Sequence, residues 1–251
     1  MAHLLGDRER AYRLFEPMLR ALPAVTTSTG GVAWVREFYA GRLAAEGRPD
    51  LAIPVLEASE LAFQKSQQYW FDVIRVRGVL GDAYDRAGRT EEARRALKSS
   101  LDGQAANRAP DNPDVMAIRE RWGRFLVTQG DRDGAAEQFR KVLAQAHGRP
   151  LVHIALAYGG LARLALAAHD SGAALTASRE AIARFDRASG GIIDMRTGPY
   201  LWLIHSAVLG ATGDRAGARE WAQKALDASR RYDDPSSPTI AEAEAAVRAA
   251  S

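Results

Sequence analysis

The chain has 251 residues, of which 47% are hydrophobic and 26% are charged, a composition typical of a folded globular protein. Its 34 lysines and arginines nearly balance 31 aspartates and glutamates, and the net charge of +3 is too even for a nucleic-acid-binding face. Cysteine is absent, which excludes disulfides, thiolate metal sites and cysteine nucleophiles.

The sequence also predicts where the protein resides. Charged residues occupy positions 7 to 10, where a secretion signal would have an apolar stretch, and no apolar run is long enough to cross a bilayer. We therefore predict a cytoplasmic protein that has no membrane or nucleic-acid partner. Arginine is strongly preferred over lysine and alanine is abundant, which we interpret as the composition of a GC-rich bacterial gene.

A two-residue motif, which we call the punctuation, recurs along the whole chain, with copies 41, 41, 42, 39 and 44 residues apart. The copies are Gly6-Asp7, Gly47-Arg48, Gly88-Arg89, Gly130-Asp131, His169-Asp170 and Gly213-Asp214. An alanine follows five residues after the first member of each copy, namely Ala11, Ala52, Ala93, Ala135, Ala174 and Ala218. This regularity indicates one structural unit repeated through the sequence.

Each punctuation has the chemistry of a turn between two helices. Glycine adopts the left-handed conformation that ends a helix, and a following aspartate can cap the next helix. Where aspartate is missing, Pro49 fits the first turn of a helix and Thr90 is expected to supply the cap. We predict that His169 is a turn residue rather than a ligand, because histidine tolerates left-handed geometry better than most residues.

Apolar residues recur at helical spacing on both sides of each turn. Leu80-Gly81-x2-Tyr84 precedes the turn at Gly88, and Ala93-x3-Leu97 follows it. The next copy has the same pattern, with Trp122, Gly123, Ala135 and Phe139. This pattern resembles the tetratricopeptide repeat (TPR), a unit of two helices, over essentially the whole chain.

The period of this sequence exceeds the usual TPR length of about 34 residues. It is similar to the long-helix variety of bacterial regulatory proteins. The last unit is also similar to the C-terminal repeat regions of bacterial serine/threonine kinases and transcriptional regulators.

The resemblance implies an all-α fold, a right-handed α-α superhelix of about five complete helix pairs. We expect one solenoid domain, 1–251, whose parts are 1–21 (a half repeat), 31–66, 70–104, 114–147, 151–188, 198–231 and a C-terminal cap at 236–251. The helix predicted at 7–21 has no partner before it. We therefore expect the chain to be part of a larger protein, or its N-terminal edge to meet a second copy or an upstream domain.

In such a superhelix the first helices of successive pairs line the concave surface. Counting back 13, 10, 6 and 3 residues from each turn selects one face of those helices, which we call the groove stripe. The candidate binding residues on it are Trp34, Glu37, Arg75, Asp82, Asp85, Glu120, Arg124, Arg163 and Tyr200.

Arg124 and Arg163 hold equivalent places in adjacent repeats and are expected to stand side by side, where they could grip a carboxylate or phosphate. The alternative is that both arginines pair with Glu120, Asp82 and Asp85 and only solvate the groove.

The sequence contains no pattern of a catalytic, metal or cofactor site. Its histidines, at positions 3, 147, 153, 169 and 205, have no metal-ligand spacing, and no serine lies in a nucleophile motif. His153 and His205 are interpreted as interior histidines, and the tryptophans at 70, 122, 202 and 221 as packing residues. We predict that the protein is not an enzyme and has no cofactor or metal.

Two functions remain open from the sequence. The first is a non-catalytic scaffold or regulatory domain that binds a protein or peptide, as part of a larger bacterial protein. The alternative is a sensor that binds a small anionic ligand through Arg75, Arg124 and Arg163. Binding of RNA is disfavoured by the acidic positions of the groove.

Overall fold

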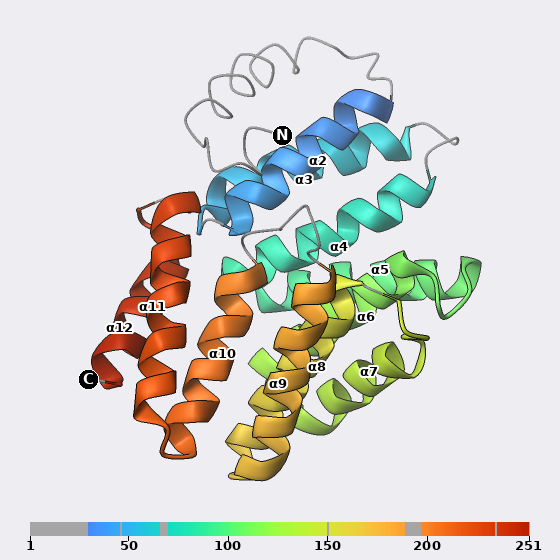
Figure 1. The fold of residues 1–251 in the computed structure, drawn as a ribbon. Coiled ribbons are helices and arrows are strands. Elements are labelled where there is room, and N and C mark those ends of the chain that lie inside the picture. The colour runs from blue at the N-terminus through green and yellow to red at the C-terminus, as the bar shows by residue number, and fades with distance from the viewer. Residues whose placement is uncertain are drawn as a thin grey trace. The chain divides into compact units, whose positions relative to one another are not determined.

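A computed structural model describes residues 30–45, 47–65, 70–149, 151–188, 197–233 and 235–250. These residues form helices and turns without a strand (Figure 1). The helices are α2 (Gly30–Ala45), α3 (Pro49–Gln64), α4 (Trp70–Arg86), α5 (Thr90–Asn107), α6 (Pro113–Thr128), α7 (Arg132–Ala144), α8 (Val152–Ala167), α9 (Ser171–Ala188), α10 (Thr197–Ala211), α11 (Arg215–Tyr232) and α12 (Pro238–Ala249). The predicted helix 7–21, with Gly6 and Ala11, lies outside the described residues.

The all-α prediction is confirmed, and the second helix of each described pair begins two residues after the first member of its punctuation. Helices α2 and α3, α4 and α5, α8 and α9, and α10 and α11 pack as consecutive pairs (Figure 1). Short turns reverse the chain within each pair, so the two helices run antiparallel.

The turn residues have the left-handed backbone that the punctuation predicts. Their φ angles are 84° at Gly47, 72° at Gly88, 78° at Gly130, 58° at His169 and 90° at Gly213. His169 is therefore a turn residue, as predicted. The aspartates beside three of these turns cap the following helices, with side-chain oxygens that accept from backbone N–H groups at 2.9 Å; they are Asp131, Asp170 and Asp214.

The expectation for Thr90 is wrong. Thr90 is already the first helical residue of α5, and the cap position belongs to Arg89, whose side chain makes no capping hydrogen bond. Arg89 instead pairs with Glu92 at 2.7 Å, which places a carboxylate in the first turn of the helix. A carboxylate there is favoured by the partial positive charge of the helix N-terminus.

The alanine after each turn is buried between paired helices, as the repeat requires. Its exposed fraction is 0% at Ala52, Ala93, Ala135 and Ala174 and 2% at Ala218. Small residues on the partner helix permit the close approach. A Cβ added at Gly81 would overlap the side chain of Leu97, and Ser206 Oγ donates to the carbonyl of Ala218 at 2.7 Å.

The described residues divide into two compact units, an N-terminal unit that ends at Phe125 and a C-terminal unit that begins at Leu126. The core of the first includes Leu56, Phe63 and Leu80. The core of the second includes Phe185 and Trp202, and α12 packs on α10 and α11. Each unit therefore encloses apolar side chains from several of its own helices.

The tryptophans are buried to different degrees. Trp202 is 7% exposed and belongs to the core of the C-terminal unit, as predicted, whereas Trp122 and Trp221 are half-buried. The prediction for Trp70 is wrong, because this side chain is 41% exposed. Trp70 is the first residue of α4, and its ring stacks on the adjacent Phe71, with centroids 3.6 Å apart, instead of entering the core.

Candidate functional site

The predicted groove stripe is divided between the two units. Trp34 belongs to α2, and its side chain lies outside the described residues. Helices α2, α4 and α6 of the N-terminal unit carry Glu37, Arg75, Asp82, Asp85, Glu120 and Arg124. Helices α8 and α10 of the C-terminal unit carry Arg163 and Tyr200.

A buried carboxylate joins α2 to α4. Glu37 is only 5% exposed and forms an ion pair with Arg75. Arg75 also donates from Nη2 to Asp72, one turn earlier in α4, at 2.7 Å. Burial raises the pKa of Glu37 to about 7, although the charges of Arg75 and Arg121 oppose this rise.

A second buried carboxylate lies in α6. Glu120 is 1% exposed, and its Oε1 accepts from Nε of Arg124 at 2.5 Å. Burial raises the pKa of Glu120, and the Arg124 charge opposes this effect. Asp82 of α4 faces the same group, with Oδ2 at 3.8 Å from Arg124 Nη2 and 3.4 Å from Arg121 Nη1.

We call this set the ionic ladder, and it runs across three successive first helices. Its members are Glu37, Asp72, Arg75, Asp82, Glu120, Arg121 and Arg124. Each of its guanidinium groups already meets a carboxylate, which weakens the attraction of that group for an incoming anion. The pairing of Arg124 with Glu120 and Asp82 follows the alternative drawn from the sequence. Asp85 is half-buried on the same helix as Asp82.

Sequence reasoning missed two members of the ladder. Asp72 lies three residues before Arg75, a spacing at which opposite charges meet on a helix. The sequence therefore contained a signal that could have predicted this pair. Arg121 lies one position beyond the counted stripe, and only the packing of α6 against α4 brings it to Asp82. Counting back from the turn selects one residue per helical turn. A long arginine side chain at the next position can still contact a residue of the neighbouring helix.

The C-terminal part of the stripe has a different character. Arg163 is exposed, and its Nη1 donates to the hydroxyl of Tyr200 at 3.4 Å, which joins α8 to α10. Among the residues that the structure describes, no carboxylate lies within ion-pair distance of Arg163. Because Arg124 and Arg163 belong to different units, their expected adjacency stays a prediction.

Solved structures with the same arrangement of helices allow a comparison. The chain is similar to BtubC from P. vanneervenii, with a TM-score of 0.61, 19% identity and coverage of 91% of this chain and 89% of that one. It is also similar to a putative kinesin light chain with nearly identical TPR-like repeats from Podosopora anserina, with a TM-score of 0.57, 18% identity and coverage of 81% and 97%. The chain has a TPR-like fold. No protein-family model and no curated protein matches the sequence.

His205 of α10 contacts residues of both α9 and α11. Its Nδ1 is 2.9 Å from Ser178 Oγ, and its ring meets Trp221 edge-on with centroids 5.0 Å apart. The side chain is 7% exposed, and burial lowers its pKa, which favours the neutral ring. His205 is thus an interior histidine, as predicted.

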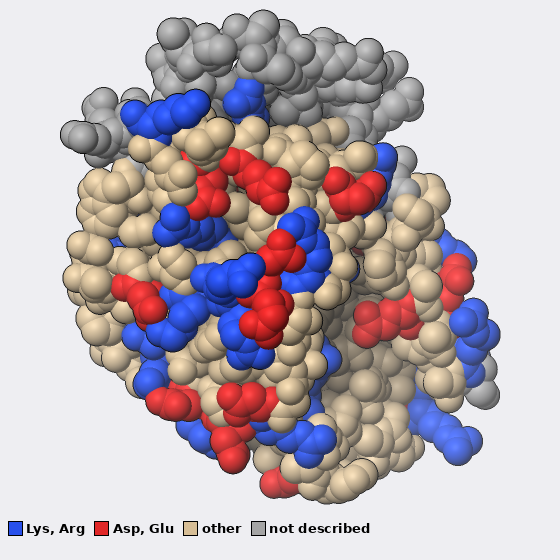
Figure 2. All heavy atoms as spheres, turned by 180° about the vertical axis from the view of Figure 1, so that it is seen from behind, with Lys and Arg blue, Asp and Glu red and all other residues tan. Residues whose placement is uncertain are grey.

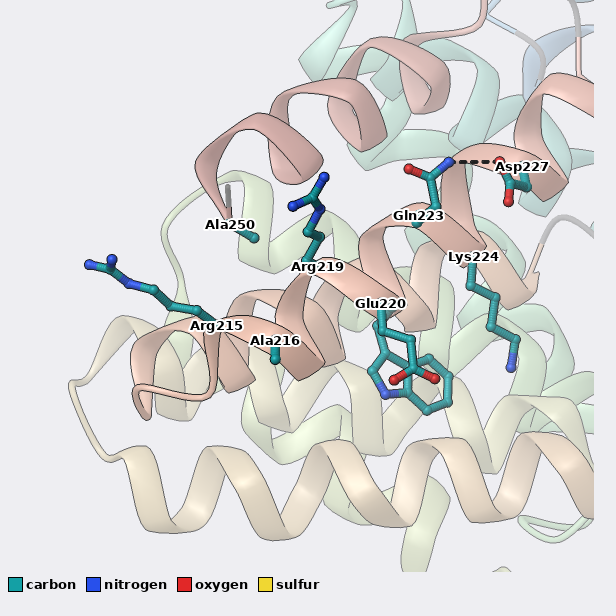
Figure 3. A pocket seen from close by; sticks show the side chains of 9 residues that line it. Arg215, Ala216, Arg219, Glu220, Gln223, Lys224, Asp227 and Ala250 are labelled. Carbon is teal, nitrogen blue, oxygen red and sulfur yellow. Dashed lines mark hydrogen bonds between the residues drawn. The ribbon is translucent and has the colours of Figure 1, made fainter.

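A hollow on the surface of α11 is a second place where a ligand could bind to the TPR-like chain. It is lined by Arg215, Ala216, Arg219, Glu220, Trp221, Gln223, Lys224, Asp227 and Ala250 (Figure 3). Figure 3 shows Arg215 and Arg219 pointing in different directions, while Gln223 donates to Asp227 at 2.8 Å. Lys224 Nζ lies 4.4 Å from the ring centroids of Trp202 and Trp221. These polar groups do not converge on one point.

In the part of the chain that the structure describes, no three or more histidine, aspartate or glutamate side chains are grouped to hold a metal ion. None of the described helices has the length and apolar character needed to span a membrane.

Proposed function

We propose that this TPR-like chain is a non-catalytic scaffold that binds a segment of another protein along the groove stripe. The observation that carries the proposal is the ionic ladder, whose ion pairs join α2 to α4 through Glu37 and Arg75, and α4 to α6 through Asp82. Buried ion pairs add little net stability because desolvation offsets the attraction, and they are better suited to fixing one arrangement of neighbouring helices. Polar groups held in fixed positions can meet the donors and acceptors of a polypeptide segment.

The same geometry favours a polypeptide over a small anion. Arg75 and Arg124, two of the three arginines expected to hold an anion, already pair with carboxylates at Glu37, Asp72, Glu120 and Asp82. A polypeptide segment carries donors and acceptors together, so it can meet both signs of charge without breaking these pairs. The anion sensor stays the alternative, and only Arg163 supports it.

The sequence expectations for the wider context remain part of this proposal. We propose a cytoplasmic regulatory part of a larger bacterial protein, with the repeat units 31–66 to 198–231 and an N-terminal edge that meets a second copy or an upstream domain. Figure 2 shows one face on which positive and negative side chains are interspersed without a large field of one sign. That distribution supports a protein partner rather than nucleic acid.

A pull-down from a bacterial extract, quantified by mass spectrometry, tests the proposal. The bait proteins are the wild-type chain, the stripe variant Asp82→Lys and the matched variant Asp102→Lys on the exposed face of α5. A partner retained by wild type and Asp102→Lys but lost by Asp82→Lys is the expected result, provided that all three have the same helical circular dichroism. Equal retention by all three would contradict binding along the stripe.

A further inference from the structure

The first helices of the two units differ sharply in charge. Helix α4 carries six charged residues and α6 carries five. In the C-terminal unit, α8 carries one, Arg163, and α10 carries none. The contrast means that the part of the stripe on α8 and α10 is apolar apart from a single guanidinium.

Besides Arg163 and Tyr200, the residues of the stripe on α8 and α10 are small or apolar. Leu156 and Leu166 of α8 are half-buried, and Ala207 and Gly210 of α10 are exposed. Alanine and glycine have little or no side chain, so the backbone of another polypeptide can approach α10 closely at these positions. Apolar side chains of a partner would gain from contact with this surface by leaving water.

Covering this surface with a partner would remove water from Arg163. A guanidinium that loses water without a counter-charge is costly, and a carboxylate that accepts from two of its N–H groups offsets this cost. Among the described residues, none supplies such a carboxylate to Arg163. A carboxylate of the partner would offset this cost.

Tyr200 adds a second donor at the same place. Arg163 Nη1 donates to the tyrosine oxygen at 3.4 Å, a long hydrogen bond that leaves the hydroxyl proton available. The remaining guanidinium N–H groups and this O–H group are then all close to one another. Convergent donors of this kind suit one oxyanion with two oxygens.

We infer that Arg163 and Tyr200 recognise one side-chain carboxylate of the bound polypeptide segment, at the centre of an otherwise apolar contact on α8 and α10. This inference rests on the proposed function and names the chemistry of the partner. The stripe continues beyond Arg163 in both directions along α8, to Leu156 and to Leu166. The acidic residue therefore lies within the segment, with apolar residues on both sides of it.

Selection of random peptides displayed on phage tests the inference. The peptides are fused to the phage through their C-terminal ends, so that an acidic group can only be a side chain. The selecting proteins are the wild-type chain, Arg163→Glu and the matched variant Arg140→Glu on α7, where Arg140 is exposed. Wild type and Arg140→Glu should enrich peptides with one aspartate or glutamate among apolar residues, and Arg163→Glu should enrich lysine or arginine at that place.

Affinities of one selected acidic peptide complete the test. Relative to wild type, binding should weaken by about tenfold or more in Arg163→Glu and by about threefold in Tyr200→Phe. Enrichment of the same acidic peptides by all three selecting proteins would overturn this inference and leave the proposed function standing. Failure of the wild-type chain to enrich any peptide would overturn the proposed function, and the inference with it.

Discussion

Arg124 lies against a carboxylate that is almost fully buried, with its Nε 2.5 Å from Oε1 of Glu120, one turn earlier in α6. The pair also meets Asp82 of α4, so it connects two first helices of the N-terminal unit. The energetic value of such a pair depends on which partner is removed, because an isolated buried charge costs far more than the intact pair contributes.

Arg124→Ala should therefore destabilise the protein by about 3 kcal/mol, because Glu120 remains buried without its guanidinium. The second substitution Glu120→Gln in the same protein should recover most of that loss, since it removes the stranded charge. Urea unfolding followed by circular dichroism measures both effects. A loss below about 1 kcal/mol in Arg124→Ala would mean that Glu120 takes up a proton or that Arg121 replaces the lost charge.

The raised pKa of Glu37, about 7, predicts a pH dependence of stability. Because the folded protein binds this proton more tightly than the unfolded chain, stability is highest below the usual pKa of a glutamate and falls as pH rises toward 7. The loss between pH 5 and pH 8 should be on the order of 2 kcal/mol, and Glu37→Gln should reduce it. Urea unfolding at both pH values tests this. Equal pH dependence in wild type and Glu37→Gln would refute the role of Glu37.

Gly81→Ala should destabilise the pair α4–α5 by about 1 to 3 kcal/mol, because the new methyl group would overlap Leu97. Gly210→Ala is the matched control. Its added Cβ would meet only Ala218, at 3.8 Å, and alanine favours the helix, so stability should rise by about 0.5 kcal/mol. Thermal unfolding of both variants gives the comparison. If Gly81→Ala were as stable as Gly210→Ala, the close approach of α4 and α5 would not limit packing.

His169 has a positive φ of 58°. Histidine tolerates this backbone conformation, but it is unfavourable for a residue that is branched at Cβ, such as valine. His169→Val should lower stability by about 1 to 2 kcal/mol, whereas His169→Gly should leave it unchanged or raise it. Thermal unfolding of the two variants is sufficient to decide. Tolerance of valine at this position would show that the turn does not need left-handed backbone.

Local sequence signals are sufficient for much of this fold. A glycine or histidine with positive φ ends the first helix of a pair, and in three pairs an aspartate caps the second helix. Both effects depend only on residues that are close together in the sequence. The buried alanines, such as Ala93 and Ala174, mark where paired helices meet because only small side chains fit there. For this reason the described second helices begin at a fixed distance from the turn residues.

The sequence alone therefore determined the described helices and the turns between them. Only the tertiary structure decided that Glu37 and Glu120 are buried, that Asp72 and Arg121 join the ladder, and that Trp70 stays exposed. It also decided that Arg75 and Arg124 are paired while Arg163 meets only Tyr200 among the described side chains. Helical spacing sets which face a residue occupies, but the charge it meets depends on distances between helices that are far apart in the sequence.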